Sequence, residues 1–355
     1  MWLPRDAAKP AALGASIAVG VALRRWFRRY NAEAVAYFVG LLDNPPESIE
    51  EPVRRVYAYA AKKRRAFEDA NAPRALPDVV DLVCSGGGFK VCLAGGLALA
   101  LRDLGVRGER FAGASAGAQV AFLALNDDLD AALRWALAVA TTLRAYPFAY
   151  PAPLWEIFYR GRARHYGAPR PGRLVASVTE VTKRRLGVPL AGESRLVDAF
   201  DDGEDLGEAL LATAAVPWLL AAGLSRPFRG KPCLDGGLTR NCPHFRDGAR
   251  PQLVVSWDEL DDGLCARTAG LYFSGEEMVE LATLGIDAAY DLAAGGRAPC
   301  VALVPAGAPA ASLPAAVGRG ADRVALADLV AAALATYVRP LERRAIRRTS
   351  SVARS

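Results

Sequence analysis

Short apolar runs alternate with longer runs of helical spacing along most of this chain. The run Val79–Cys84 is apolar except for Asp81, and proline and glycine residues bound it. A short apolar run between turn residues predicts a strand that is buried on both faces. The longer apolar run 90–104 follows it and ends at Gly105, which predicts a helix.

The same alternation continues toward the C-terminus. Further strands are predicted at 110–112, 173–181, 232–234, 252–257 and 298–304. Further helices are predicted at 116–126, 129–143, 203–215, 275–292 and 322–344. Alternating strands and helices predict an α/β fold with a mostly parallel central sheet and helices on both faces. Ligands of such sheets lie beyond the carboxyl ends of the strands.

One arginine-rich segment interrupts this alternation. Residues 160–173 hold five arginines, His165 and two prolines. Because prolines interrupt regular structure and arginines favour solvent, this segment is predicted to be an exposed basic loop.

The first forty residues differ from the rest. Residues 11–23 are all apolar or small, and a mixed arginine and aromatic block follows them: Arg24, Arg25, Trp26, Phe27, Arg28 and Arg29. As a helix the apolar run spans about 20 Å, less than the roughly 30 Å of a bilayer core. It therefore favours an interfacial anchor over a lone spanning helix. The alternatives are an organelle transit peptide, a cleaved secretory signal and an ordinary packed helix.

Composition limits the classes of site and partner. Hydrophobic residues make up 52% of the chain, which is ample for a folded core. The six cysteines form no C-x-x-C pair and the chain has only two histidines, so a zinc site is not expected. A reducing compartment is the default expectation, although the even number of cysteines leaves disulfides open. The net charge of +6 suits a membrane surface or a merely solvated basic surface, and no nucleic-acid-binding motif is present.

Residues 113–117 read G-A-S-A-G and fit the pattern G-x-S-x-G between a predicted strand and a predicted helix. A nucleophilic serine needs a sharp strand-to-helix turn with small neighbours on both sides. The helix that follows directs its N-terminus toward the serine, which favours negative charge there. Ser115 is therefore a candidate nucleophile, although the pattern also arises by chance in chains rich in glycine and alanine.

Gly86, Gly87 and Gly88 form another turn, directly after the predicted strand Val79–Cys84. Backbone N–H groups that are aimed at an oxyanion stabilise it by roughly 3–4 kcal/mol each. The rival interpretation is a nucleotide-binding loop of the form G-x-G-x-x-G, but Val91 stands at the third glycine position. An oxyanion hole is the favoured hypothesis.

A serine nucleophile also needs a base. The two histidines, His165 and His244, are both predicted to be ordinary surface residues. Asp235 precedes two glycines after a short predicted strand, so its carboxylate is predicted to lie on a tight turn and to take the serine proton directly. Asp-Gly is also a plain turn signal, so Asp235 taken alone carries no functional argument.

Four motifs occur in a fixed order: S-G-G-G-F-K from Ser85, G-A-S-A-G from Gly113, A-T-A-A-V-P from Ala212 and L-D-G-G-L-T-R-N-C-P from Leu234. Together they resemble the patatin-like phospholipase family over residues 78–258. The family often has a glycine at the position of Val91, so this chain departs from the pattern there.

The resemblance implies a serine–aspartate dyad, in which Ser115 is the nucleophile and Asp235 the base. It places Gly86, Gly87 and Gly88 in the oxyanion hole. It also implies hydrolysis of lipid esters, with phospholipids or neutral glycerolipids as substrates and no metal or other cofactor for the chemistry. The alternative is a catalytically silent lipid-binding or scaffold protein of the same fold.

Three parts of the chain are predicted on this basis. Residues 1–72 are helices that associate with a membrane or target the protein, residues 73–258 are the catalytic domain, and residues 259–355 are a helical extension with a basic tail. The protein is therefore expected to be intracellular and membrane-associated, with a lipid substrate and no nucleic-acid partner.

Overall fold

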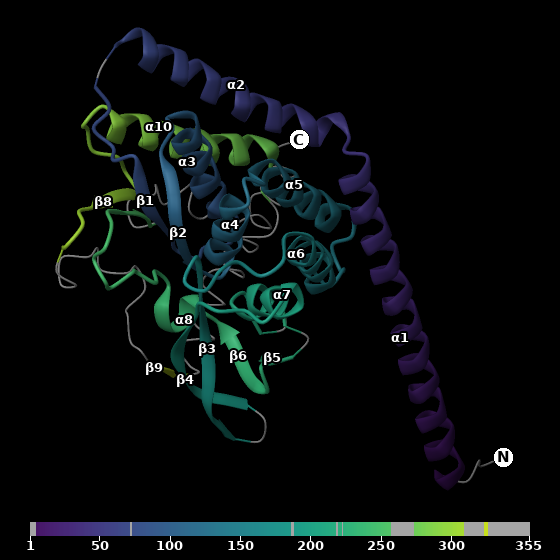
Figure 1. Cartoon of the computed structure of the whole chain (residues 1–355). Coiled ribbons are helices and arrows are strands. Elements are labelled where there is room, and N and C mark those ends of the chain that lie inside the picture. The colour runs from purple at the N-terminus through teal and green to yellow at the C-terminus, as the bar shows by residue number, and fades with distance from the viewer. Residues whose placement is uncertain are drawn as a thin grey trace, which may run out of the picture.

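The computed structural model describes residues 5–71, 73–185, 188–217, 219–221, 223–256, 273–308 and 323–325. Their strands form one mixed sheet in which most strands point the same way, and helices flank this sheet (Figure 1). The predicted α/β fold is thus confirmed. Its physical basis is the buried apolar strand, which needs a neighbouring layer on each face.

Four neighbouring strands at the centre of the sheet run parallel. They are β3 (Leu174–Arg185), β2 (Arg107–Ala114), β1 (Val79–Cys84) and β7 (Gln252–Val255), in that spatial order. The register places Cys84 opposite Gly113 and Ala114 opposite Ser177. The carboxyl ends of β1 and β2 therefore lie side by side, and the turns that follow these strands are neighbours.

Antiparallel strands complete both edges. The strands β4 (Val188–Val197) and β6 (Lys231–Asp235) pair with β3, and β5 (Arg226–Phe228) pairs with β6. On the other side β8 (Val301–Val304) pairs with β7, and β9 (Arg323–Ala325) pairs with β4. β2 ends opposite Ser177 of β3, and β6 ends with Asp235 opposite Val178. Adjacent residues of β3 thereby bring the ends of β2 and β6 together.

Several helices pack near the parallel strands, and two of them, α3 (Val91–Asp103) and α10 (Gly275–Ala293), are in close contact. The helix α3 follows the 3₁₀ turn η1 (Gly88–Lys90), and the other helices are α4 (Ala116–Leu125) and α5 (Leu129–Ala145). A Cβ atom at Gly96 of α3 would lie 2.0 Å from the Ala282 carbonyl oxygen, and one at Gly285 of α10 would lie 2.0 Å from the Leu93 carbonyl oxygen. The backbones of α3 and α10 are therefore in direct contact, and a side chain at either glycine would separate them.

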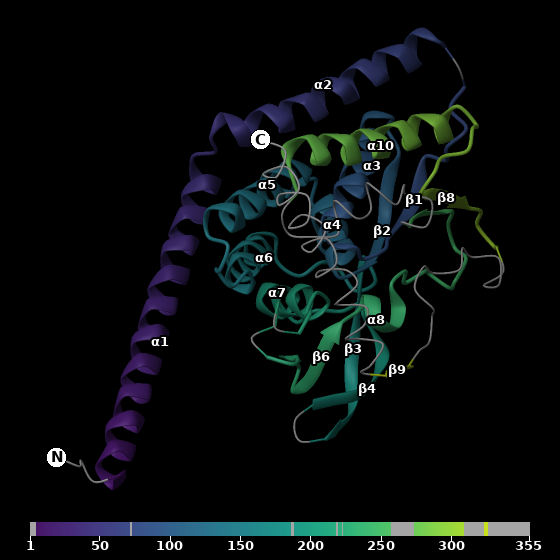
Figure 2. The same ribbon diagram turned by 180° about the vertical axis from the view of Figure 1, so that it is seen from behind.

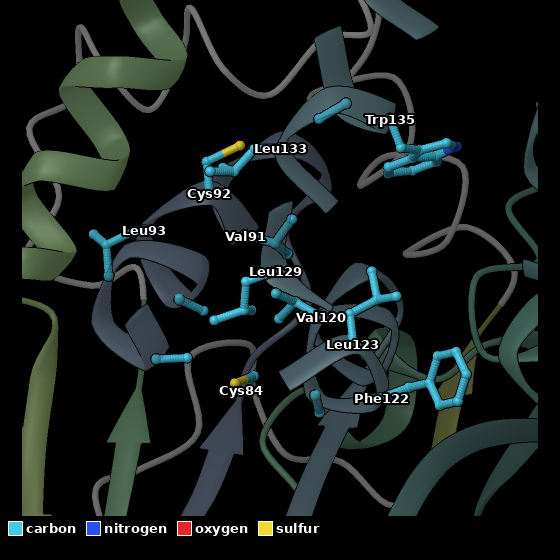
Figure 3. Close-up of a cluster of buried hydrophobic side chains, with 14 of the residues drawn as sticks. Cys84, Val91, Cys92, Leu93, Val120, Phe122, Leu123, Leu129, Leu133 and Trp135 are labelled. Carbon is cyan, nitrogen blue, oxygen red and sulfur yellow. The ribbon is translucent and has the colours of Figure 1, made fainter. Parts of the chain in front are cut away.

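Two apolar clusters lie on opposite faces of the sheet. The larger joins Val80, Leu82 and Cys84 of β1 to the helices. The smaller contains Val83 of β1 and Cys242, and Phe245 packs against it. Successive side chains of a strand point to opposite faces, which explains the split along β1. Figure 3 shows part of the larger cluster, including Cys84, Val91, Cys92, Leu93, Val120, Phe122, Leu123, Leu129, Leu133 and Trp135.

The N-terminal segment forms two long helices. The helix α2 (Glu47–Asp69) lies along α10, where Arg55 pairs with Glu276, and Tyr59 donates a hydrogen bond to Asp287. The helix α1 (Arg5–Asp43) buries Phe38 near its C-terminal end, and its N-terminal half projects away from the body (Figures 1 and 2). No helix within the described residues is long and apolar enough to cross a bilayer.

The predicted exposed loop at 160–173 is wrong for residues 160–166, which are helical, whereas residues 167–173 lie outside helices and strands as predicted. Its first half belongs to the helix α6 (Ala152–Tyr166), which is followed along the chain by α7 (Gly203–Ala212) and α8 (Gly237–Arg240). One side of α6 is buried in the core: Leu154, Trp155, Phe158, Tyr159 and Ala163. Arg160 and Arg164 pair with Glu208 and Glu204 of α7. These ion pairs join α6 to α7, and the glutamates of α7 neutralise the charges of the two arginines.

Other differences concern short strands. The strands β4 and β5 were not predicted; β4 pairs with β3 and β9, and β5 pairs with β6. In the predicted helix 322–344, Arg323–Ala325 is instead the strand β9, whose backbone groups pair with the exposed edge of β4. The other residues of that predicted helix lie outside the described residues. The predicted strand 252–257 ends at Val255 as β7, and Trp257 lies outside the described residues.

The predicted division of the chain at residues 72 and 258 stays a prediction. Past the second boundary, β8 continues the central sheet and α10 packs on α3. These two elements therefore contribute to the same core as the strands that precede them.

Candidate active site

Ser115 lies at the turn between β2 and α4. Its φ of 53° and ψ of −134° are unusual for a residue with a side chain and show that the turn is strained. A Cβ atom at Gly113 would lie 2.4 Å from the Ala118 nitrogen, and one at Gly117 would lie 2.3 Å from the Cys84 carbonyl oxygen. Only glycine fits at these two positions, which gives the G-x-S-x-G spacing a steric reason.

Asp235 is the last residue of β6, and its carboxylate faces Ser115. The Ser115 hydroxyl donates a hydrogen bond of 2.6 Å to Oδ2 of Asp235, and the Gly237 amide donates one of 2.8 Å to Oδ1. The side chain is buried, with a residue exposure of 7%. Burial raises the pKa of Asp235 to about 6, against the lowering effects of both hydrogen bonds. Near neutral pH this carboxylate is mainly ionised, and it has the proton affinity of a general base.

The glycine loop lies against the serine turn. A Cβ atom at Gly86 would lie 2.8 Å from the Ser115 Cβ. The Gly86 amide donates a hydrogen bond of 2.9 Å to Oδ1 of Asn241, and Nδ2 of Asn241 donates one of 3.3 Å to the Gly86 carbonyl. Among the described residues, the amides of Gly87 and Gly88 donate no hydrogen bond, and both residues are half-buried. These two amides are therefore available to an anion beside Ser115.

Two residues of this site had no predicted role. Asn241 belongs to the motif that begins at Leu234, and its side chain joins the glycine loop to the segment that follows Asp235. Thr213 directly follows α7, and its hydroxyl accepts a hydrogen bond of 2.9 Å from the Ser115 amide. The sequence signal for both was their place within the ordered motifs. Their contacts span 155 and 98 residues, which no local pattern reveals.

A buried ion pair holds the chain segment after the site against the sheet. Asp81 of β1 is fully buried and accepts two hydrogen bonds from Arg110 of β2. Arg110 also donates to Asp247 at 2.9 Å and lies 4.2 Å over the ring of Phe245. The guanidinium group lowers the pKa of Asp247 to about 2. The ion pair with Arg110 therefore explains why the apolar strand β1 contains one charged residue, Asp81.

Neither histidine is the hydrogen-bond partner of the Ser115 hydroxyl, whose acceptor is Asp235. His165 lies in the last turn of α6 beside Tyr166, and His244 is half-buried in the segment after α8. Val91, the departure from the glycine pattern, is buried at the first position of α3. In the described parts of the chain, no three His, Cys, Asp or Glu side chains are grouped as a metal site.

Comparison with known families agrees with this geometry. The sequence model of the Patatin-like phospholipase family matches residues 82–245. The match contains the glycine loop, Ser115, Thr213, Asp235 and Asn241, and it confirms the resemblance predicted from the four motifs. No match was found among curated proteins.

Proposed function

Because residues 82–245 belong to the patatin-like phospholipases, a family that acts on lipid substrates, we propose that this protein hydrolyses carboxylic esters of phospholipids or neutral glycerolipids. The observation that carries the proposal is the hydrogen bond of 2.6 Å from the Ser115 hydroxyl to Asp235. It joins a nucleophile on a strained turn to a buried carboxylate of raised proton affinity.

The proposed first step is attack of the Ser115 Oγ on the ester carbonyl carbon. Asp235 takes the hydroxyl proton as the new C–O bond forms, and the carbonyl oxygen becomes an oxyanion. When the tetrahedral intermediate collapses, the bond to the leaving alcohol breaks and the alcohol receives the proton from Asp235. Water then attacks the acyl-enzyme, with Asp235 again as base, and releases the fatty acid and free Ser115.

The oxyanion needs donors that are in place before the reaction. The Gly86 amide is bound to Asn241, so we assign the oxyanion to the amides of Gly87 and Gly88. The N-terminus of α4 begins directly after Ser115, and its dipole favours the same charge. All three glycines were expected to bind the oxyanion. In this proposal Gly86 does not bind it and instead supports the loop through its contact with Asn241.

The pH dependence follows from the burial of Asp235. We expect kcat/KM to fall below about pH 6, by about tenfold per pH unit, because the protonated carboxyl cannot accept the Ser115 proton. Hydrolysis of a soluble short-chain ester, measured between pH 4 and 9, gives this profile. A profile that stays flat down to pH 4 would exclude Asp235 as the base.

The experiment that tests the proposed function uses the purified full chain. Phospholipids, lysophospholipids and triacylglycerols are incubated with it separately, and released fatty acids are measured by mass spectrometry. A serine-reactive fluorophosphonate probe is applied in parallel. Release of fatty acid from one class together with labelling at Ser115 is expected. Folded protein that neither labels nor hydrolyses any of these lipids would support the silent scaffold instead.

A membrane surface is the proposed second partner. Trp26 and Phe27 of α1 are 52% and 44% exposed. In the described part of the chain, Arg24, Arg25 and Arg28 form no ion pair. Exposed aromatic rings and unpaired arginines on one helix segment match the interface of an anionic bilayer. We infer that this segment brings the protein to its lipid substrate.

We expect charge reversal at Arg24, Arg25 and Arg28 to reduce sedimentation with anionic vesicles at least several-fold, since each basic residue contributes about 1 kcal/mol near such a surface. Vesicles of phosphatidylserine and phosphatidylcholine serve as the probe. The control reverses Lys62 and Arg65, which are exposed on α2 and are expected to matter little. Equal losses in both variants would remove the assignment to α1.

A further inference from the structure

A side-chain hydroxyl replaces one backbone hydrogen bond where β2 leaves the sheet. The Phe111 amide donates to the Arg173 carbonyl at 2.8 Å. Successive hydrogen bonds of a parallel ladder are two residues apart. The ladder therefore assigns the amide of residue 113 to the carbonyl of residue 175, and the amide of residue 115 to the carbonyl of residue 177. At Ser115 the chain turns away into α4, and the Thr213 hydroxyl completes this bond. It accepts from the Ser115 amide at 2.9 Å and donates to the Ser177 carbonyl.

This hydroxyl satisfies a donor that neither neighbouring element can satisfy. Ser115 precedes the first residue of α4, where its carbonyl accepts from Ala118 but its own amide has no acceptor inside the helix. Thr213 is fully buried. A buried amide without a partner is costly, so the strained turn depends on this one side chain.

The backbone around Thr213 also holds the turn that carries the base. The Gly236 amide donates to the Thr213 carbonyl at 2.8 Å, and the Asp235 amide donates to the Ala215 carbonyl at 3.2 Å. A Cβ atom at Gly236 would lie 1.8 Å from the Ser177 carbonyl oxygen and 3.1 Å from the Thr213 hydroxyl. The three segments that meet here are therefore closely packed.

We propose that Thr213 is a positioning residue, which sets the place of the Ser115 hydroxyl relative to Asp235 by bridging the Ser115 amide and the Ser177 carbonyl. This inference rests on the proposed hydrolase function. Thr213 acts through Ser115 and touches no substrate. Its hydroxyl, and not its volume, is the group that matters, since only the hydroxyl both accepts from one strand and donates to the next.

The test compares two pairs of proteins, and within each pair only one member has a hydroxyl at position 213. The first pair is wild type and Thr213→Val, and the second pair is Thr213→Ser and Thr213→Ala. We expect the two variants without a hydroxyl to lose about 10²-fold in kcat, with KM nearly unchanged, because a misplaced nucleophile affects the chemical step. Thr213→Ser is expected to retain kcat within a few-fold of wild type. If Thr213→Val does not fold, the serine and alanine pair still isolates the hydroxyl.

Two further measurements separate positioning from a general loss of stability. The hydrogen bond from Ser115 lowers the pKa of Asp235, so a displaced Ser115 is expected to move the acid limb of kcat/KM to higher pH in Thr213→Val. Hydrogen exchange of the peptide that contains the Ser115 amide is expected to be faster in both variants without a hydroxyl. The matched control is Thr142→Val, a fully buried threonine of α5.

The outcomes are distinct. Unchanged kcat, acid limb and exchange in Thr213→Val or Thr213→Ala would overturn the positioning role while leaving the hydrolase proposal intact. A wild-type protein without activity or labelling would overturn the hydrolase proposal. Faster exchange in the variants without a hydroxyl would then still support the bridge as the holder of the Ser115 turn, and unchanged exchange would reject it.

Discussion

Replacement of Ser115 by alanine is expected to reduce lipid-ester hydrolysis by at least about 10⁴-fold, because removal of a nucleophile that acts together with its base removes the covalent route. Ser115 is half-buried as a residue, and among the described residues its hydroxyl bonds only to Asp235. Its loss is therefore expected to leave the fold and the unfolding temperature nearly unchanged. Fatty-acid release and fluorophosphonate labelling measure the effect.

The matched control for this change is Ser194→Ala, which removes the buried hydroxyl of a half-buried residue on β4 that forms no hydrogen bond to Ser115 or Asp235. It is expected to label and hydrolyse like wild type. Full activity in Ser115→Ala would show that Ser115 is not the nucleophile. Loss of activity in both variants, with lower unfolding temperatures, would indicate damage to the fold instead of to the chemistry.

Replacement of Asp235 by asparagine is expected to lower kcat by about 10⁴-fold while stabilising the protein at alkaline pH. Folding raises the pKa of this carboxyl from its ordinary value of 3.8 to about 6. The proton therefore binds the folded state more tightly. Its contribution to stability is fully present below about pH 4 and is lost as the pH rises through 6. Above pH 7 the buried charge costs about 3 kcal/mol, since one pKa unit corresponds to about 1.4 kcal/mol.

Thermal unfolding at pH 8 and at pH 4 separates these two effects. Asp235→Asn is expected to have the higher unfolding temperature at pH 8, and the difference is expected to shrink at pH 4, where both side chains are neutral. The control is Asp198→Asn, because the Asp198 residue is exposed and its charge stays in solvent. A lower unfolding temperature of Asp235→Asn at pH 8 would contradict a raised pKa at this site.

The motifs named the candidate residues of the site, but they did not predict how these residues contact one another. The four motifs named Ser115, Asp235 and the glycine loop, and the family model that matches residues 82–245 confirms the resemblance. Their catalytic roles stay predictions until the substitutions are made. The sequence did not reveal that Asn241 binds Gly86, which leaves Gly87 and Gly88 as the available donors. That division of roles depends on a contact between segments 155 residues apart.

Elements whose stability is local were predicted well. The strand β1 and the helices α4 and α5 begin at the predicted residues, because their apolar runs, turns and glycines are adjacent in the chain. The helix α6 was not predicted, because its arginines suggest solvent when read alone. They are compatible with a packed helix only because Glu204 and Glu208 of α7 face them.

The sequence by itself determined the turn at Ser115. Gly113 and Gly117 are required by backbone atoms that approach within 2.4 Å of where a Cβ would be, and such steric requirements are written into the local sequence. Only the tertiary structure decided that the Ser115 hydroxyl lies 2.6 Å from Asp235. The reason is that β3 pairs with both β2 and β6, so its adjacent residues Ser177 and Val178 set the ends of the two strands side by side.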